Sequence, residues 1–150
     1  MNDDEFNAMV DKIQEEVFAE AKNVLGAKGF DRWRNPKFCG KIEDADSFAR
    51  VKGSCGDTME MYLKFSGDCV ERVSYLTDGC GSSSVAGSFT AELAMGKNVE
   101  QIFEMSGADV LEKIGSFPEA EEHCAYLAVE TLHEALNQYM VDQVKKNSSI

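Results

Sequence analysis

Apolar residues recur at every third or fourth position over residues 4–25, which predicts an amphipathic helix with one apolar face. Gly26 and Gly29 are expected to end this helix. The next residues, 30–40, are aromatic and basic and include Pro36, which disfavours regular structure. A loop folded over the core is therefore expected there.

The period of the pattern then changes from three or four residues to two. A short strand is expected at residues 47–52, and apolar and polar residues alternate over residues 59–65 and again over residues 70–77. Residues 66–68 have the composition of a turn, so the last two segments are predicted to form an antiparallel hairpin. Because such a hairpin brings its outer ends together, Cys55, Asp57 and Cys80 should lie at one edge of the sheet.

Helical patterns return in the second half of the chain. The expected helices cover residues 82–96, a short segment from Asn98 to residue 105, residues 108–114 and residues 120–145. Strands followed by helices are typical of the α+β class, and the length fits one domain over residues 1–150. Within this domain, residues 1–30 are expected to hold the N-terminal helix, and residues 146–150 to form a frayed tail.

Composition and charge exclude several classes of function. No apolar run approaches the ~18 residues of a membrane span, and the acidic start, residues 1–5, does not resemble a signal peptide. We therefore expect a cytoplasmic protein without membrane contact. The net charge of −12 argues against nucleic acid as a partner, because phosphate binding requires clustered Lys and Arg.

The cysteine pattern points to metal or thiol chemistry. The chain has five cysteines, an odd number, and no Cys-x-x-Cys pair, which argues against a disulfide framework, a zinc ribbon and a thioredoxin-like motif. Cys39 and Cys69 do not fall at the predicted edge of the sheet and are interpreted as structural or incidental. Any site must be assembled from Cys55, Cys80 and Cys124, which are distant in the sequence.

Two of these cysteines fall at predicted helix starts. Cys80 lies between Gly79 and Gly81, where a strand is expected to pass into a helix, and Cys124 lies in the first turn of the last helix. Glycines permit unusual backbone angles and the close approach of a bulky group. Free N–H groups and the positive end of a helix dipole favour the thiolate, which is both the nucleophile and the metal ligand. The serines at 82–84 are interpreted as a helix cap.

Asp57 and His123 add oxygen and nitrogen donors to the three cysteines. Zinc accepts such mixed sets, whereas iron–sulfur clusters are normally held by four thiolates. A site with three thiolates would hold a cluster less firmly, which suits a protein that passes its cluster on. Taken alone, an aspartate such as Asp57 is more often a turn or cap residue than a ligand, and His123 has capping or ion pairing with the neighbouring glutamates as its alternative.

Four motifs in order resemble the iron–sulfur cluster assembly scaffold family, which includes the IscU-type proteins and the N-terminal domain of NifU. They are Asn35-Pro36, Gly53-Ser54-Cys55-Gly56-Asp57, Gly79-Cys80-Gly81-Ser82-Ser83-Ser84 and His123-Cys124. The resemblance covers residues 33–140. It implies an α+β fold with a three-stranded antiparallel sheet packed by helices and the cysteines at one exposed end. The family's metal ligands correspond in position to Cys55, Asp57, Cys80, His123 and Cys124. Among them, Asp57 matches the aspartate linked to cluster release, and Cys124 is the preferred sulfur acceptor.

The resemblance also implies a function. Members accept sulfur from a pyridoxal-phosphate cysteine desulfurase, combine it with iron into a transient [2Fe–2S] cluster, in some cases [4Fe–4S], and pass it to apo-proteins. They are scaffolds rather than enzymes. The alternative is a zinc-bound sulfur-relay protein of the SufU type, against which the absence of an insertion between the second and third cysteines speaks. A structural zinc domain is disfavoured, because it would not need glycines on both sides of Cys80.

The chain departs from the family pattern just before His123. IscU-type proteins have a Leu-Pro-Pro-Val-Lys segment there, which a dedicated Hsp70-type chaperone reads. This chain has Phe117-Pro118-Glu119-Ala120-Glu121, with acid in place of the lysine. The departure argues against a chaperone partner and leaves the desulfurase and apo acceptor proteins as the expected partners. No C-terminal extension of the full-length NifU kind is expected.

Overall fold

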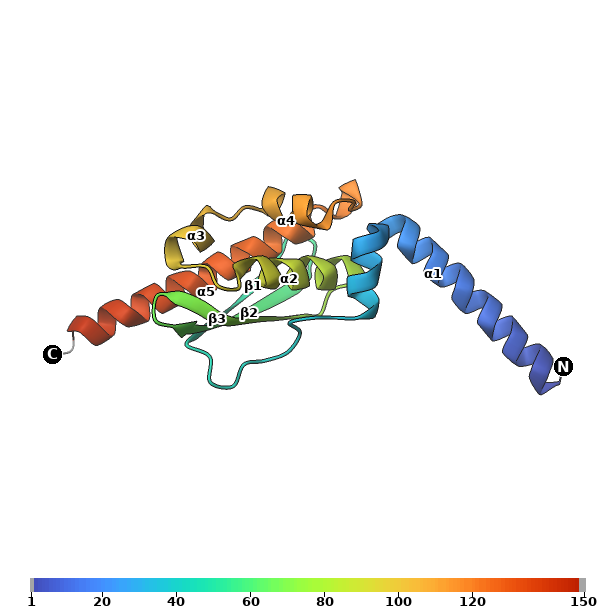
Figure 1. Cartoon of the computed structure of the whole chain (residues 1–150), viewed down its shortest axis with the longest axis horizontal. Coiled ribbons are helices and arrows are strands. Elements are labelled where there is room, and N and C mark those ends of the chain that lie inside the picture. Colours follow the sequence, from blue (N-terminus) through green and yellow to red (C-terminus); the bar gives the residue numbers. More distant parts are fainter. Residues whose placement is uncertain (1, 149–150) are drawn as a thin grey trace.

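The computed structural model describes residues 2–148, which contain five α-helices, one short 3-10 helix and one sheet. The helices cover one face of a three-stranded antiparallel sheet with strand order β1-β2-β3 (Figure 1). This arrangement confirms the predicted α+β fold. The elements in chain order are α1 (Asp3–Arg34), β1 (Ser47–Lys52), β2 (Thr58–Ser66), β3 (Cys69–Thr77), α2 (Gly81–Ala94), α3 (Val99–Glu104), α4 (Gly107–Ile114), η1 (Glu119–Glu121) and α5 (His123–Ser148).

The alternating pattern places the apolar side chains of β2 under the helices. Met59, Met61 and Leu63 alternate along β2, and all three are fully buried. Helix α5 packs across β1 and β2, and α2 packs across β3. Small and branched residues of α2 and α5, among them Val85 and Leu132, close the core between these two helices. The three predicted strands and the predicted antiparallel hairpin are confirmed.

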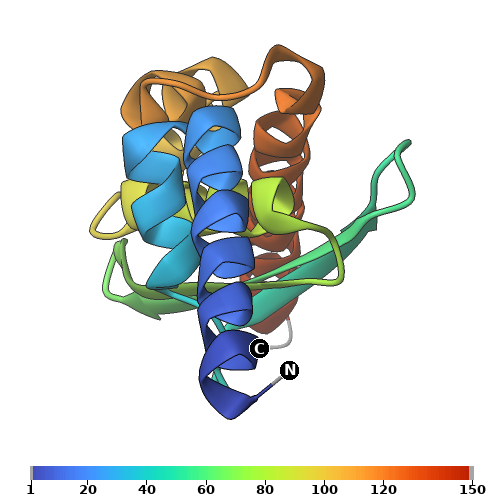
Figure 2. The ribbon, with the colours of Figure 1, turned by 90° about the vertical axis from the view of Figure 1, so that its right-hand side faces the viewer.

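Helix α1 is interrupted by a kink at Gly26, which divides it into two helical segments. Gly26 has φ 77°, a left-handed conformation that glycine adopts at little cost, and a Cβ at this position would lie 2.8 Å from the carbonyl oxygen of Ser116. The predicted break at Gly26 is therefore present. A second helical segment follows it through Arg34, so the expectation of a loop from residue 30 is wrong. The first half of α1 projects from the body (Figures 1 and 2).

The part of α1 before Gly26 has its apolar side chains mostly in solvent. Six of its large apolar side chains are 42% to 53% exposed, whereas Leu25 at its end is buried. The contribution of this half to the core is therefore small. The exposed residues are Phe6, Met9, Val10, Ile13, Val17 and Val24.

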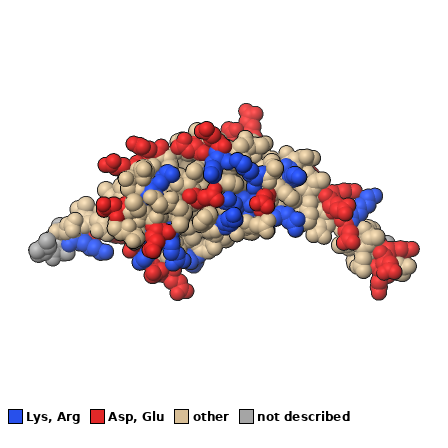
Figure 3. Space-filling view, viewed as in Figure 1, with Lys and Arg blue, Asp and Glu red and all other residues tan. Residues whose placement is uncertain are grey.

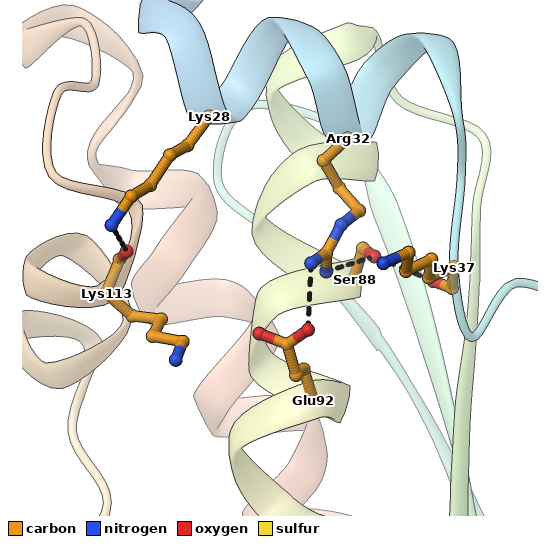
Figure 4. Close-up of polar contacts among 6 residues, drawn as sticks. All are labelled: Lys28, Arg32, Lys37, Ser88, Glu92 and Lys113. Atoms are coloured by element: carbon orange, nitrogen blue, oxygen red, sulfur yellow. Dashed lines mark hydrogen bonds and ion pairs between the residues drawn. The ribbon is translucent and has the colours of Figure 1, made fainter.

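The second half of α1 is fastened to the body by a buried cation. The Arg32 side chain is only 8% exposed, and its guanidinium donates to Ser88 Oγ at 3.0 Å and to Glu92 Oε1 at 2.8 Å (Figure 4). It also lies 4.0 Å from the centre of the Phe89 ring. A buried charge is tolerated only when it is paired in this way. Arg32 therefore fixes α1 on α2, next to the turn that carries Cys80.

The segment after α1 agrees with its prediction at residues 38–40, whereas the end of α5 differs. Residues 38–40 lie in a loop that is held against β3, because the Gly40 N–H donates to Tyr75 O and the Tyr75 N–H donates to Phe38 O, both at 2.9 Å. Helix α5 continues to Ser148, past residue 146, where the frayed tail was expected to begin. Residues 149–150 of that expected tail lie outside the described residues.

Charge is distributed unevenly over the surface. On the face drawn in Figure 3, acidic side chains cover the free end of α1 and the upper edge, while Lys and Arg lie mainly over the middle. Within residues 2–148, no helix is both long enough and apolar enough to cross a bilayer.

Candidate metal centre

Two turns at the same end of the sheet carry the first three candidate ligands. Cys55 and Asp57 lie in the β1–β2 turn, and Cys80 follows β3. The turns are tied together, because the Thr58 N–H donates to Asp78 Oδ1 at 2.7 Å and Thr77 Oγ1 donates to the Thr58 carbonyl at 2.8 Å. The hairpin argument thus placed these residues correctly. Their function as ligands remains a prediction.

The fully buried Ser83 joins these turns to the start of α5. Its hydroxyl donates to Asp57 Oδ2 at 2.8 Å and lies 3.5 Å from Cys124 Sγ. Its neighbour Ser84 shares a hydrogen bond with the Tyr75 hydroxyl. The interpretation of this serine run as a helix cap is therefore wrong: the N-cap of α2 is Cys80, and no side chain caps the helix there. Instead, Ser83 links a carboxylate and a thiol that come from distant parts of the chain.

The two glycines beside Cys80 are needed for close approach rather than for unusual backbone angles. Neither has a positive φ. A Cβ on Gly79 would lie 2.5 Å from Ser83 Oγ and 2.7 Å from Asp57 Oδ2, and a Cβ on Gly81 would lie 3.2 Å from the Trp33 ring. Ser83 and Asp57 therefore pack against the bare backbone of Gly79, and Trp33 of α1 packs against that of Gly81.

Cys124 is the buried member of the site. Its thiol is fully buried in the first turn of α5, and its Sγ lies 3.7 Å from His123 Nε2 and 3.8 Å from Glu121 Oε2. Burial raises the pKa of the Cys124 thiol from its ordinary 9.0 to about 11, and the charge of Glu121 adds to the rise, although the Ser83 hydrogen bond opposes it. We expected the helix start to favour the thiolate at this position, but desolvation outweighs the helix dipole.

The other candidates are open to solvent. Cys55, Cys80 and His123 are exposed, so the site lies at an exposed end of the fold, as predicted, with one buried thiol. His123 Nδ1 lies 3.1 Å from the Ala120 carbonyl. Because a carbonyl only accepts hydrogen bonds, Nδ1 carries the proton, and Nε2 presents its lone pair toward Cys124.

Sequence reasoning missed Ser83 and Glu121. The donor atoms of Glu121, His123 and Cys124 all lie within 4.8 Å of one another, a spacing that can hold a metal ion. The sequence did contain a signal for Glu121: it lies two and three positions before His123 and Cys124 at a predicted helix start. Residues this close in sequence can place their side chains on the same side of the chain. Ser83 gave no such signal, because its contacts depend on how α2 packs against α5.

The remaining cysteines and the second histidine lie outside this site. Cys39 forms an isolated backbone β-bridge with Tyr75. Cys69, at the opposite end of the hairpin, forms another with Asn98. The ring of His133 lies with Nε2 2.8 Å from the Ile102 carbonyl, which connects α5 to α3. The structure therefore gives these residues positions in the packing of the fold, away from the turns that carry Cys55 and Cys80.

Similarity to known proteins defines the class. The NifU-like N terminal domain family matches residues 26–146. The chain therefore belongs to this family, and the resemblance drawn from its motifs is confirmed.

Individual relatives carry more specific names. The iron-sulfur cluster assembly scaffold protein IscU 1 of Archaeoglobus fulgidus is 36% identical over 124 residues, which cover 82% of this chain and 78% of that protein. The scaffold protein IscU of Aquifex aeolicus is 33% identical over 119 residues, covering 77% and 76%. Among solved structures, FiSufU of Fervidobacterium islandicum superposes with a TM-score of 0.63 at 26% identity, covering 77% of this chain and 98% of that one.

Proposed function

We propose that this protein is a scaffold on which an iron–sulfur cluster is assembled and from which the cluster passes to apo-proteins. The observation that carries the proposal lies at one end of the sheet. The exposed cysteines Cys55 and Cys80 lie there on two turns, and Ser83 contacts both Asp57 and Cys124. Relatives that carry the name of scaffold support it. Since the cluster is cargo, the thiols act stoichiometrically, and we propose that the protein is not an enzyme.

The proposed ligands are three thiolates with an oxygen and a nitrogen donor in reserve. Cys55, Cys80 and Cys124 supply sulfur, while Asp57 and His123 supply the harder donors. Clusters are normally held by four thiolates, so a transient [2Fe–2S] cluster on three would be labile. Thiols must be deprotonated to bind metal. Binding therefore releases the proton that Cys124 holds in the metal-free chain.

We propose Cys124 as the first sulfur acceptor. Its thiolate would attack the terminal sulfur of a persulfide on a cysteine desulfurase. One S–S bond forms on Cys124 as the donor's S–S bond breaks, and the donor leaves as a thiolate, so no outside oxidant is required. Because the thiol is buried, transfer requires the start of α5 to move when the donor arrives.

The proposed partners are a cysteine desulfurase and apo iron–sulfur proteins. Both reach the site at the open end, where Cys55 and Cys80 are exposed. We propose that release does not use an Hsp70-type chaperone, because residues 117–121 carry two glutamates and no lysine. We further propose that assembly takes place in the cytoplasm.

A zinc-bound sulfur relay is the second candidate. FiSufU, whose name assigns it to the SUF system, has the same fold, and zinc binds the same mixture of sulfur, nitrogen and oxygen donors. In this function, the protein would carry persulfide without building a cluster. Zinc in a purified sample would not decide between the two, because zinc binds readily to thiolate sites.

Anaerobic reconstitution tests the proposal. Wild type, Cys80→Ser and the control Cys69→Ser, which changes an exposed cysteine outside the site, receive ferrous iron, cysteine and a desulfurase, and then an apo-ferredoxin. We expect wild type and the control to become coloured and to lose iron and sulfide as the ferredoxin matures, whereas Cys80→Ser binds no stable cluster. A colourless wild type that retains zinc and persulfide would favour the relay. A normal cluster on Cys80→Ser would contradict the ligand assignment.

Asp57 is proposed to control release. Its carboxylate oxygen accepts the Ser83 hydroxyl, so it can exchange between this hydrogen bond and the metal. We expect Asp57→Ala to keep its cluster longer, because the variant lacks the carboxylate that can displace another ligand of the cluster during transfer. Transfer to apo-ferredoxin should be about tenfold slower, at the low end of the effects of changing a residue at a metal site. The measurement is the decay of cluster absorption after apo-ferredoxin is added. Faster release would overturn this role.

A further inference from the structure

We propose that Glu121 is a metal ligand, and that Glu121, His123 and Cys124 form a subsite that binds one divalent first-row metal ion without Cys55 or Cys80. This inference rests on the proposed function, which it deepens by naming where the first metal ion enters. The observation behind it is that a carboxylate oxygen, an imidazole nitrogen and a thiol sulfur all lie within 4.8 Å of one another.

The side chains of the triad already point at a common position. Glu121 Oε2 lies 3.8 Å and His123 Nε2 lies 3.7 Å from Cys124 Sγ. These separations are longer than a hydrogen bond between nitrogen and oxygen, and they match the spacing between neighbouring ligands around one ion whose bonds are about 2.0–2.3 Å long.

His123 is held as metal-ligating histidines are. Its Nδ1 lies 3.1 Å from the Ala120 carbonyl, which requires the proton on Nδ1 and leaves Nε2 free to bind a metal. An outer hydrogen bond that fixes the tautomer and the ring orientation is typical of histidine ligands. This contact is independent of the distances within the triad, and it indicates a prepared nitrogen donor.

The donor set defines the ion. Thiolate and imidazole suit iron, zinc and cobalt, while a carboxylate beside them disfavours a purely soft metal such as Cu(I). The two negative charges of the carboxylate and the thiolate balance a dication. Glu121 and His123 lie at the surface side of Cys124, so an ion can enter from solvent. In assembly, ferrous iron would bind here first and then be shared with the thiols of the two turns.

The test isolates the triad and uses Co²⁺ as the probe. In the Cys55→Ser/Cys80→Ser double variant, which changes two exposed residues, Co²⁺ is titrated while thiolate-to-cobalt charge-transfer absorption is followed. We expect one equivalent to bind with this absorption. Adding Glu121→Gln should weaken binding at least tenfold, whereas the control Glu119→Gln, which removes the same charge from the same 3-10 helix at an exposed position, should not.

The outcomes separate this inference from the proposed function. Absence of cobalt–thiolate absorption in the double variant, or a loss of less than tenfold for Glu121→Gln relative to Glu119→Gln, overturns the subsite. Cluster reconstitution of the wild-type chain is measured in parallel. If wild type builds no cluster while the triad still binds Co²⁺ through Glu121, the scaffold function fails and the subsite remains. If wild type builds a cluster and Glu121→Gln has no effect on Co²⁺ binding, the subsite fails and the scaffold function remains.

Discussion

Cys80 and Cys124 occupy equivalent positions in the secondary structure and are nevertheless different thiols. Each lies at the start of a helix, where the dipole favours the thiolate. Cys80 is exposed on a turn flanked by glycines, whereas Cys124 is buried and surrounded by Ser83, Glu121 and His123. The pKa of the Cys124 thiol rises to about 11, chiefly because burial removes it from water.

The comparison shows that solvation, more than the local element, sets the state of these thiols. A helix terminus contributes typically 0.3–1 kcal/mol to a nearby charge (up to about 2 in favourable, partly buried geometries), while two pKa units correspond to about 2.7 kcal/mol. The same fold therefore exposes one thiol to solvent and keeps another buried and protonated in the metal-free chain. Each of the following experiments tests that difference, beginning with the largest expected effect.

Alkylation rates should separate the two cysteines most clearly. With iodoacetamide at pH 8 and metal removed by a chelator, we expect Cys124 to react at least about 100-fold more slowly than the exposed Cys80. A pKa two units above its ordinary value leaves about one hundredth of the thiolate, which is the reactive form, and burial adds to this. The Cys124 rate should climb about tenfold per pH unit and level off only near pH 11. Peptide mass spectrometry measures both rates, and similar rates at pH 8 would contradict the comparison.

The position of the exposed Cys80 could be predicted from the sequence, and the reason is geometric. Alternation along Met59, Met61 and Phe65 predicts a strand, and an antiparallel hairpin has to bring its ends together. Cys55, Asp57 and Cys80 were therefore placed at one edge without knowledge of the helices. Local pattern and one topological rule were sufficient for this part of the site.

The surroundings of the buried Cys124 could not be predicted from the sequence, because they depend on how the helices pack. Ser83 reaches Asp57 and Cys124 only when α2 lies against α5, and hydrophobic periodicity specifies a helix face but not its partner. Gly26 shows the same limit. A glycine after an amphipathic pattern predicts a helix end, yet the ion pair of the buried Arg32 with the half-buried Glu92 stabilises a second helical segment beyond it.

Ser83 should matter to the buried thiol far more than its neighbour does. Ser83→Ala removes the hydroxyl that contacts Asp57 and Cys124, so both lose an outer-shell partner. We expect metal affinity to fall about 10- to 100-fold, as measured by competition with a chelator for Co²⁺. Ser82→Ala is the matched control, because within residues 2–148 the Ser82 side chain has no hydrogen bond and is also buried. Equal affinities in the two variants would show that Ser83 only fills space.

The smallest expected effect concerns the stability of the metal-free chain. Cys124→Ala removes a fully buried sulfur from the core cluster, and we expect the free energy of unfolding to fall by about 1 kcal/mol, the lower range for loss of a buried group. Cys80→Ala should change it by less than about 0.5 kcal/mol, because Cys80 is exposed and makes no side-chain cap bond.

Urea unfolding with a chelator present measures both variants, and equal slopes would show that the midpoints report stability alone. If the two midpoints coincide, then Cys124 is not part of the packed core in solution, and the start of α5 is already open. That outcome would also remove the basis for slow alkylation. Sulfur transfer to Cys124 would then require no opening step, and the contrast between the two thiols would belong to the metal-bound protein alone.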